Sequence, residues 1–194
     1  VIMVEDCTNF KIIQWYAKKS DLAEGTCVII RDLKLKNIIV KIVRMDNAGE
    51  NLLFEKLSKT SQWNLNLTFE YNARSTPQHN HLAELGFAAL SNKGRAMLIA
   101  ANIPMKYRYH LFREAFKSAT DLDGLVVVDV KGSKKTRHEH FYGSIPPWAK
   151  QLKHLKVFGE AGTVKIKTKT SRKLADRGVQ YMYVGIAENH SSDT

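Results

Sequence analysis

Two carboxylates occupy positions where they could do chemistry. Asp46 follows the apolar run "NIIVKIVRM" and precedes "NAGE", whose Asn and Gly suit a loop. Glu84 is the single charged residue of "STPQHNHLAELGFAAL", residues 75–90. A carboxylate in so apolar a helix either faces solvent or needs a cationic partner. If the two acids converge, they suit a hard cation such as Mg²⁺, which takes oxygen ligands and supports in-line attack on phosphorus.

The overall charge bears on the partner of such a site. The chain has 194 residues, an apolar share of 44% and a net charge of +11. This balance favours a polyanionic partner, nucleic acid above all, although a basic surface that only keeps the protein soluble is the alternative. No run of 18 apolar residues is present, so we expect no membrane partner.

The elements that must position the two acids alternate between strands and helices. Residues 1–5 and 10–17 predict a hairpin, and Ser20 is placed to cap a helix that Asn37 closes. The remaining elements expected before residue 120 are a strand covered on both faces (37–46), a helix (52–62), a strand (65–71), a long, mostly buried helix (76–103) and a helix after Pro104 (107–120). This order predicts a mixed α/β fold.

The pattern changes after Thr120. Residues 121–137 predict a mixed strand and polar connector, and "GSIPP" predicts a turn. Two strand-like stretches, 156–170 and 178–188, follow without a helical period. We therefore expect a core domain (1–120), a connector (121–145) and a small β-barrel-like domain (146–194).

The two acidic motifs together resemble a known family. "VRMDNAGEN" and "TPQHNHLAE", in this order, are similar to the integrase core of copia-type long-terminal-repeat retrotransposons. "RAMLIAANIP", "HEHFYGSIPPWAKQLKHLKVFGEAGTVKI" and "KLADRGVQYMYVGI" resemble later segments of the same polyprotein. The resemblance implies a ribonuclease-H-like mixed sheet flanked by helices, a small SH3-like domain after it, and Mg²⁺- or Mn²⁺-dependent DNA strand transfer at a two-metal site.

Residue roles follow from the same resemblance. Asp46 would be the second catalytic and metal-binding acid and Glu84 the third. The hairpin at 1–17 matches the second and third strands of the family, so the first strand and its Asp would lie upstream of Val1. Asp6, the competing candidate for the first acid, is then a turn residue, where Asp is common.

Some residues depart from the family pattern. Ala48 replaces a Gly, His81 replaces the Gly near the acid, and Leu85 replaces a frequent Arg. These changes weaken the expected DNA-facing surface of the helix. They fit a divergent lineage or a decaying copy of the element.

A basic segment near the C-terminus is the main candidate for DNA contact. In a strand, Lys165, Lys167 and Lys169 point to one face, above an apolar underside that includes Val164. Such a row suits DNA phosphates, and a solvated strand face that blocks edge aggregation is the alternative. The other nucleic-acid-binding candidates are Arg172, Lys173, Lys93 and Arg95.

The histidines and cysteines suggest no further site. "HNH" (79–81) and "HEH" (138–140) lack metal-ligand spacing and a cysteine partner, so we interpret them as ordinary polar histidines rather than zinc ligands. Cys7 and Cys27 lie far apart in sequence, which favours a reducing, intracellular compartment.

Two functions remain open at this point. The first is DNA integration by a fragment of a retrotransposon integrase, with element and target DNA as partners. The complete enzyme would be a homo-oligomer and would act in the nucleus or in a cytoplasmic virus-like particle. The second is a non-catalytic, basic DNA-binding remnant of a decayed or host-recruited element.

Overall fold

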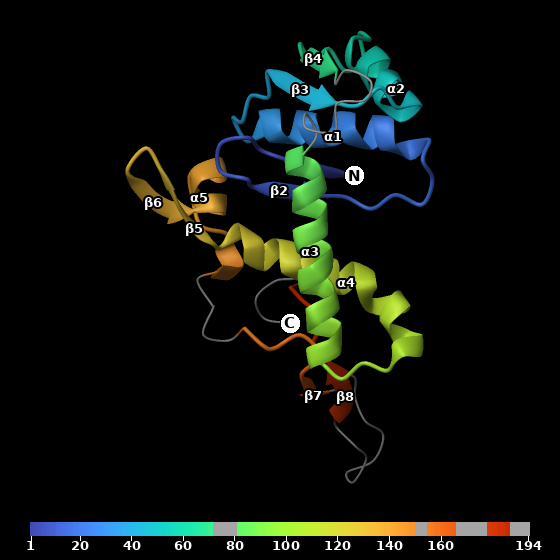
Figure 1. The fold of residues 1–194 in the computed structure, drawn as a ribbon, viewed down its shortest axis with the longest axis vertical. Helices are drawn as coiled ribbons and strands as arrows, with labels where there is room; N and C mark the ends of the chain where they lie inside the picture. Colours follow the sequence, from blue (N-terminus) through green and yellow to red (C-terminus); the bar gives the residue numbers. More distant parts are fainter. Residues whose placement is uncertain (72–80, 150–154, 166–177, 187–194) are drawn as a thin grey trace. The chain divides into compact units, whose positions relative to one another are not determined.

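The computed structural model of the chain describes residues 1–71, 81–149, 155–165 and 178–186 (Figure 1). These residues form a mixed α/β structure, as the sequence predicted, with five helices and four two-stranded sheets. The chain divides into two compact units. Unit 1 comprises residues 1–88 and 126–144, and unit 2 comprises residues 89–125 and 145–194. Among the described residues, no helix is both long and apolar enough to cross a membrane.

The predicted N-terminal hairpin is confirmed. Strand β1 (Ile2–Val4) pairs antiparallel with β2 (Lys11–Ile13). Glu5 organises the turn between them: its carboxylate accepts the backbone N–H groups of Cys7 and Thr8 at 2.9 and 2.7 Å, and the Thr8 hydroxyl at 2.6 Å. Asp6 is exposed in this turn.

Helix α1 (Asp21–Leu35) begins directly after Ser20 and ends before Asn37, as predicted, but the predicted side-chain cap by Ser20 is wrong. The Ser20 backbone is already helical, and its hydroxyl donates to the Asp21 carboxylate at 2.9 Å. Asn37 has a φ of 61°, a left-handed conformation that Asn tolerates and that stops the helix. The apolar positions recur at helical spacing, so one side of α1 is buried. Its buried residues are Ala23, Cys27, Ile30 and Leu33.

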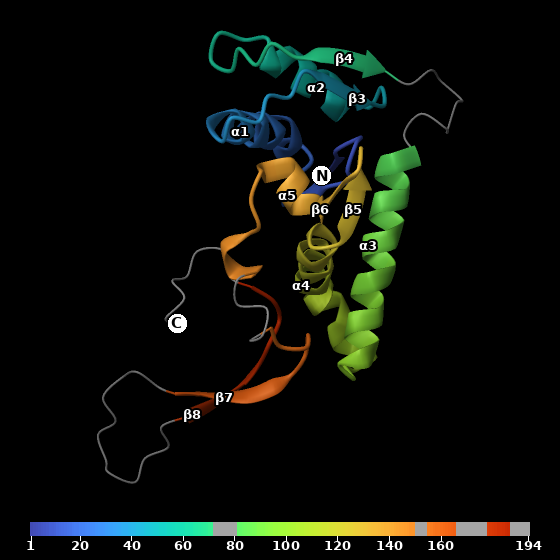
Figure 2. The ribbon, with the colours of Figure 1, turned by 90° about the vertical axis from the view of Figure 1, so that its left-hand side faces the viewer.

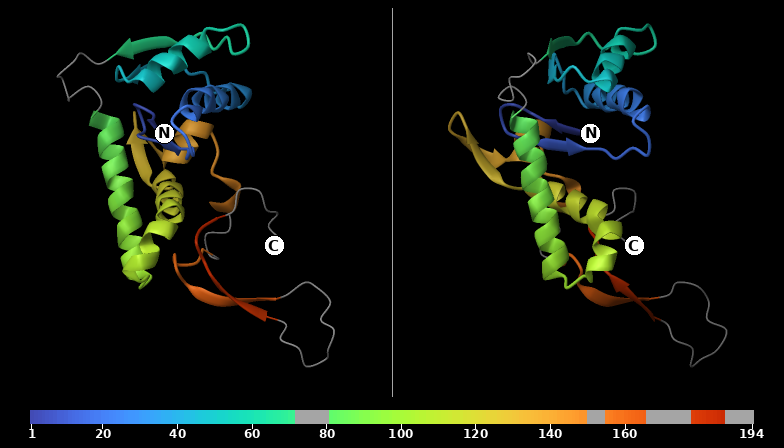
Figure 3. Two further views of the ribbon diagram at one scale, coloured as in Figure 1. Left: turned by 90° about the vertical axis from the view of Figure 1, so that its right-hand side faces the viewer. Right: turned by 45° about the vertical axis from the view of Figure 1, so that its right-hand side comes forward.

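A parallel strand pair follows. Strand β3 (Ile42–Met45) leads into helix α2 (Gly49–Ser58) and then into β4 (Thr68–Tyr71), which pairs with β3 in parallel (Figure 3). The prediction that β3 is covered on both faces is wrong. Met45 is buried whereas Ile42 is 57% exposed, because only one face of the pair carries α1 and α2.

The main core of unit 1 lies between this strand pair and the two helices. Its buried members come from α1, β3, α2 and the segment that follows α2: Ala23, Cys27, Ile30, Met45, Phe54, Trp63 and Leu65. The Phe54 and Phe69 rings meet edge-on at 5.5 Å. A single apolar core therefore fixes β3, and with it the position of Asp46.

Helix α3 (His81–Ala100) is less buried than predicted. The expectation of a mostly buried helix is wrong for the described residues, since Leu85, Phe87 and Ile99 are all about half exposed or more. Four of its buried positions recur every fourth residue along one side, and Ser91 adjoins them: Gly86, Leu90, Ser91, Gly94 and Leu98. The predicted start at 76–80 lies outside the described residues.

Helix α4 (Met105–Gly124) packs against α3 within unit 2 (Figure 2). A Cβ added to Gly94 would lie 3.3 Å from the backbone nitrogen of Phe116, so glycine permits this close approach. The predicted change at residue 120 is wrong in detail, because the helix continues to Gly124. Leu98, Ile103, Ala115 and Phe158 form the buried cluster of the unit.

The remaining elements are two hairpins and a short helix. In unit 1, β5 (Val127–Val130) pairs with β6 (Ser133–Thr136), and α5 (Arg137–Tyr142) follows with a capping box between Thr136 and Glu139. In unit 2, β7 (Ala161–Lys165) pairs with β8 (Gly178–Met182). The expected buried underside of β7 is wrong for Val164, which is 51% exposed.

Candidate functional site

Asp46 lies where β3 ends and its side chain organises the next turn. One carboxylate oxygen, Oδ1, accepts the backbone N–H of Ala48 at 3.1 Å and the side-chain amide of Asn51 at 2.6 Å. These bonds hold the carboxylate at the N-terminus of α2, where the helix dipole favours negative charge. The second oxygen, Oδ2, has no bond to a described residue, and the side chain is exposed. One oxygen of Asp46 thus stabilises the turn before α2, and the other is accessible to a ligand.

The surroundings of Asp46 are acidic. Glu50 follows in the first turn of α2, and its carboxylate lies 3.4 Å from the ammonium of Lys19. A hydrogen bond from its own backbone N–H, then the bond and charge of Lys19, lower the pKa of Glu50, while the charge of Asp46 opposes that shift. Two carboxylates therefore lie near the start of α2, and that of Glu50 is already paired with Lys19.

Glu84 lies in the first turn of α3 and is exposed. Its carboxylate has no hydrogen bond or ion pair with any described residue. The helix turn that carries it lies close to the β1–β2 hairpin: a Cβ added to Gly86 would lie 3.2 Å from the side chains of both Val4 and Lys11. The β1–β2 hairpin therefore positions the start of α3 and leaves the acid open to solvent.

The structure places Asp46 and Glu84 in the same unit. Both are hard oxygen donors of the type that Mg²⁺ and Mn²⁺ prefer. Within the described ranges, no group of three or more His, Cys, Asp or Glu side chains could hold a metal ion. The oxygen donors of the two acids suit a divalent metal. Two carboxylates alone are only part of the ligand set that such a metal needs.

The sequence reading missed the residues that hold Asp46. Asn51 and the N–H of Ala48 fix its rotamer, and neither was a candidate. The available signal was the order strand, Asp, loop, helix, since an Asp before a helix commonly accepts backbone N–H groups. Glu5 was likewise missed as the organiser of its turn, although the placing of Asp6 as a turn residue is confirmed.

The two histidines of α5 have structural partners. The His138 ring packs against Tyr142 and Phe10 with centroids 4.6 and 5.7 Å apart, and its Nδ1 lies 2.7 Å from the carbonyl oxygen of Ser144. Burial lowers the pKa of His138. His140 Nε2 lies 3.3 Å from the carbonyl oxygen of Val128. Of the "HNH" stretch, His81 is exposed, and residues 79 and 80 lie outside the described ranges.

The basic candidates divide into two groups. Lys93 is paired: its ammonium lies 2.6 Å from the carboxylate of Asp123, which is only 7% exposed. Arg95 and Lys165 are exposed, and neither forms an ion pair with a described residue. Lys167, Lys169, Arg172 and Lys173 lie outside the described ranges.

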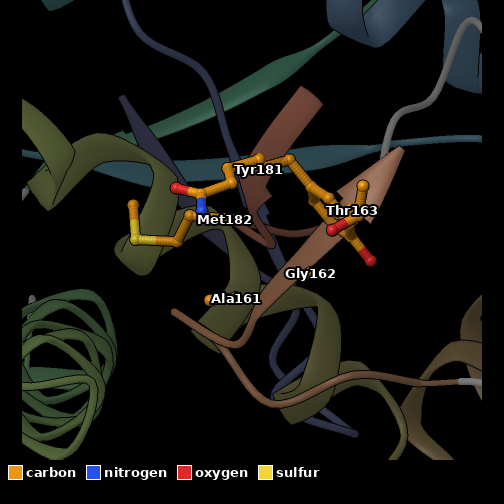
Figure 4. Close-up of a pocket in the computed structure, with 6 residues that line it drawn as sticks. Ala161, Gly162, Thr163, Tyr181 and Met182 are labelled. Atoms are coloured by element: carbon orange, nitrogen blue, oxygen red, sulfur yellow. The ribbon is translucent and has the colours of Figure 1, made fainter. Parts of the chain in front are cut away.

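A shallow hollow of about 590 Å³ lies on the β7–β8 hairpin (Figure 4). Figure 4 shows Tyr181 and Met182 from one strand beside Ala161, Gly162 and Thr163 from the other. The sixth lining residue is Gln180. Among the described residues that line it there is no Asp, Glu, His, Cys or Lys, so these residues offer neither an acid nor a metal ligand for catalysis.

Both cysteines are free thiols. Cys27 is fully buried in the core of unit 1, and burial, then the charge of Glu24, raises the pKa of its thiol to about 11. A thiol of this kind is unreactive at neutral pH.

No family model matches the chain.

Proposed function

We propose that this chain acts in DNA integration, as part of a Mg²⁺-dependent polynucleotidyl transferase of the copia-type integrase kind. Asp46 and Glu84 would be two of its metal-binding acids. Asp46 and Glu84 belong to two motifs that occur in the order typical of the family. The observation that carries the proposal is that both acids are solvent-exposed and that each has at least one oxygen without a bond to a described residue.

The local fold supports this proposal. The parallel pair β3–β4 with α2 between its strands places Asp46 at the carboxyl end of β3, the end at which α/β folds carry their ligands. A ribonuclease-H-like core followed by an SH3-like domain is the finer fold that we propose. The β1–β2 hairpin before α1 and the β7–β8 hairpin near the C-terminus are compatible with it.

A Mg²⁺ or Mn²⁺ ion bound there would stabilise charge on phosphorus and lower the pKa of an attacking hydroxyl or water. The chain itself keeps the Asp46 carboxylate in one orientation through Ala48 and Asn51. It also keeps Glu84 on a helix whose first turns are fixed against the hairpin. Preorganised carboxylates lose less entropy when a ligand arrives, so both arrangements favour binding.

A second candidate function is non-catalytic binding of DNA by a remnant of such an element. It is favoured by the net charge of +11 and by the absence, among the described residues, of a group of three acids. For either function we propose element and target DNA as the partners, and a homo-oligomer for the complete enzyme. A nucleus or a cytoplasmic virus-like particle would be the compartment.

Paramagnetic broadening by Mn²⁺ tests the metal site directly. In the ¹⁵N-labelled chain, Mn²⁺ should broaden the amide signals around both Asp46 and Glu84. Asp46→Asn and Glu84→Gln should each reduce the broadening at both places, because the two acids share the ion. Asp6→Asn is the matched control and should change nothing.

The outcomes separate the two functions. Broadening at one acid that does not depend on the other would disprove the shared site and leave the DNA-binding function. Loss of broadening in Asp6→Asn would show that Asp6, and not an upstream residue, is the first acid.

A further inference from the structure

The first two turns of α4 carry an exposed face that the proposed metal site does not use. Four side chains lie at helical spacing on this face, which we call the α4 patch: Lys106, Tyr109, His110 and Arg113. Tyr109 is 87% exposed, more than any other large hydrophobic side chain in the described part of the chain. The patch belongs entirely to unit 2.

The opposite side of the same turns is firmly anchored. Leu111 and Phe112 pack on the buried cluster of unit 2. The guanidinium of Arg108 donates to the carbonyl oxygen of Ile103 at 2.8 Å, which ties the start of α4 to the end of α3. The α4 patch is therefore carried by a fixed helix, and the exposure of Tyr109 is a property of the folded unit.

Folding stability does not explain the composition of the patch. Residues 105–113 contain no Asp or Glu, and the first turn of α4 has no acidic residue. Cations near a helix N-terminus oppose the helix dipole, which favours acidic side chains there. Lys106, His110 and Arg113 form no ion pair with a described residue. Lys106 in the first turn is thus opposed by the helix dipole, and the Tyr109 ring is solvated; an anionic partner with flat apolar groups would stabilise both.

We propose that the α4 patch binds single-stranded nucleic acid. Lys106 and Arg113 are about 10 Å apart along the helix axis and so contact separate phosphates. Tyr109 lies between them and offers a ring on which an unpaired base stacks. A duplex, whose bases are already stacked, gains only the phosphate contacts. This inference stands on the side chains of α4 and does not depend on Asp46 or Glu84.

Fluorescence anisotropy with a labelled oligothymidylate of about 15 nucleotides tests the proposal on the full chain. Tyr109→Ala should weaken binding about 5- to 100-fold, and Tyr109→Phe, which keeps the ring, should stay within about twofold. The affinity for a duplex of the same length should change by no more than about twofold in either variant. An oligouridylate arm shows whether the patch prefers RNA or DNA.

Tyr107 provides the matched control, because its ring is half exposed near Tyr109 but lies 4.7 Å from the Lys106 ammonium and is not one of the four side chains of the patch. Tyr107→Ala should leave binding of the oligothymidylate within about twofold of the unmodified chain. Lys106→Ala combined with Arg113→Ala should reduce the slope of log K against log salt for single strands by about 1.4, two phosphates at ~0.7 each.

Three results would overturn the proposal. One is an unchanged affinity of Tyr109→Ala for the oligothymidylate. Another is an equal loss on duplex and single strand, which would reduce the patch to phosphate contacts. The third is an oligomer that Tyr109→Ala dissociates in sedimentation velocity, which would assign the patch to a second copy of the chain. Circular dichroism of each variant should match the unmodified chain, since Tyr109 contributes little to the core.

Discussion

Asp46 and Glu84 of unit 1 differ from Asp123 of unit 2 in exposure and in pairing. In unit 1, Asp46 and Glu84 are exposed, and each keeps an oxygen without a bond to a described residue. In unit 2, Asp123 is buried and receives the ammonium of Lys93 at 2.6 Å. A buried carboxylate needs its partner for folding, whereas an exposed one can change partners. Exposure thus marks the acids that are available to a metal.

The basic side chains of α3 show the same contrast. Lys93 and Arg95 were equivalent candidates for DNA contact in the sequence. In the structure Lys93 lies on Asp123, while Arg95 is exposed without an ion pair among the described residues. One structural pair therefore removes a residue from the proposed DNA surface and leaves its neighbour there.

The largest expected effect is on strand transfer. We expect residues 1–194 alone not to nick or join DNA, because two acids do not hold both ions of a two-metal site. In a chain extended at its N-terminus by a strand that carries an Asp, Glu84→Gln should reduce strand transfer about a thousandfold or more. Its free energy of unfolding should change by less than about 0.5 kcal/mol, because the side chain is exposed.

The control for this prediction is Asp6→Asn, which should leave transfer unchanged. Cleavage by residues 1–194 alone that disappears in Asp6→Asn would reverse our assignment of Asp6 to the turn.

The second effect is on folding. Lys93→Ala should lower the free energy of unfolding by about 2–3 kcal/mol, because it leaves the buried Asp123 carboxylate without this cation. The matched control is Lys59→Ala: Lys59 also lies 2.6 Å from a carboxylate, that of Glu55, but its side chain is 64% exposed. That change should cost less than about 0.5 kcal/mol. Urea denaturation measures both, and equal costs would refute the contrast drawn above.

The third effect concerns Glu5 and pH. Burial raises the pKa of Glu5, but hydrogen bonds from the Thr8 hydroxyl and from the N–H groups of Cys7 and Thr8 outweigh it, so the pKa lies below 4.5. The stabilisation is therefore present above pH 4.5 and is lost as the pH falls through the lowered pKa. Glu5→Gln should cost about 1 kcal/mol at pH 7 and nothing in strong acid.

Thermal melts of Glu5→Gln and of the unmodified chain between neutral and acidic pH would show this convergence. A difference that persists at the lowest pH would contradict the hydrogen-bonded turn as its cause.

The smallest effect is on the salt dependence of duplex binding. Arg95→Ala should reduce the slope of log K against log salt by about 0.9, the value for one phosphate contact. Lys93→Ala should leave the slope unchanged, because Asp123 already neutralises the ammonium. Changing Lys165, Lys167 and Lys169 together to Ala should reduce the slope of log K against log salt by about 2–3. Equal slopes for Arg95→Ala and Lys93→Ala would remove the distinction.

Local pattern was sufficient for the elements whose signals lie within a few residues. The β1–β2 hairpin followed from two β-branched runs around a turn, and α1 followed from its helical period and Asn37. The extent of α4 did not follow, because "DLDG" contains polar residues typical of a connector. Asp123 belongs to the helix, where it pairs with Lys93, thirty positions earlier in the chain. A contact of that separation leaves no local signature.

Residue type and order by themselves determined the candidate acids, the basic character of the chain and its mixed α/β class, since each depends on composition or short periods. Only the tertiary structure decided which side chains are available. In the folded chain one side of α3 is buried, while Leu85 and Phe87 remain exposed. One oxygen of Asp46 accepts a hydrogen bond from Asn51, and the buried Asp123 carboxylate lies against the ammonium of Lys93. The physical reason is that burial and pairing depend on neighbours distant in sequence, which the packing of the helices and strands brings together.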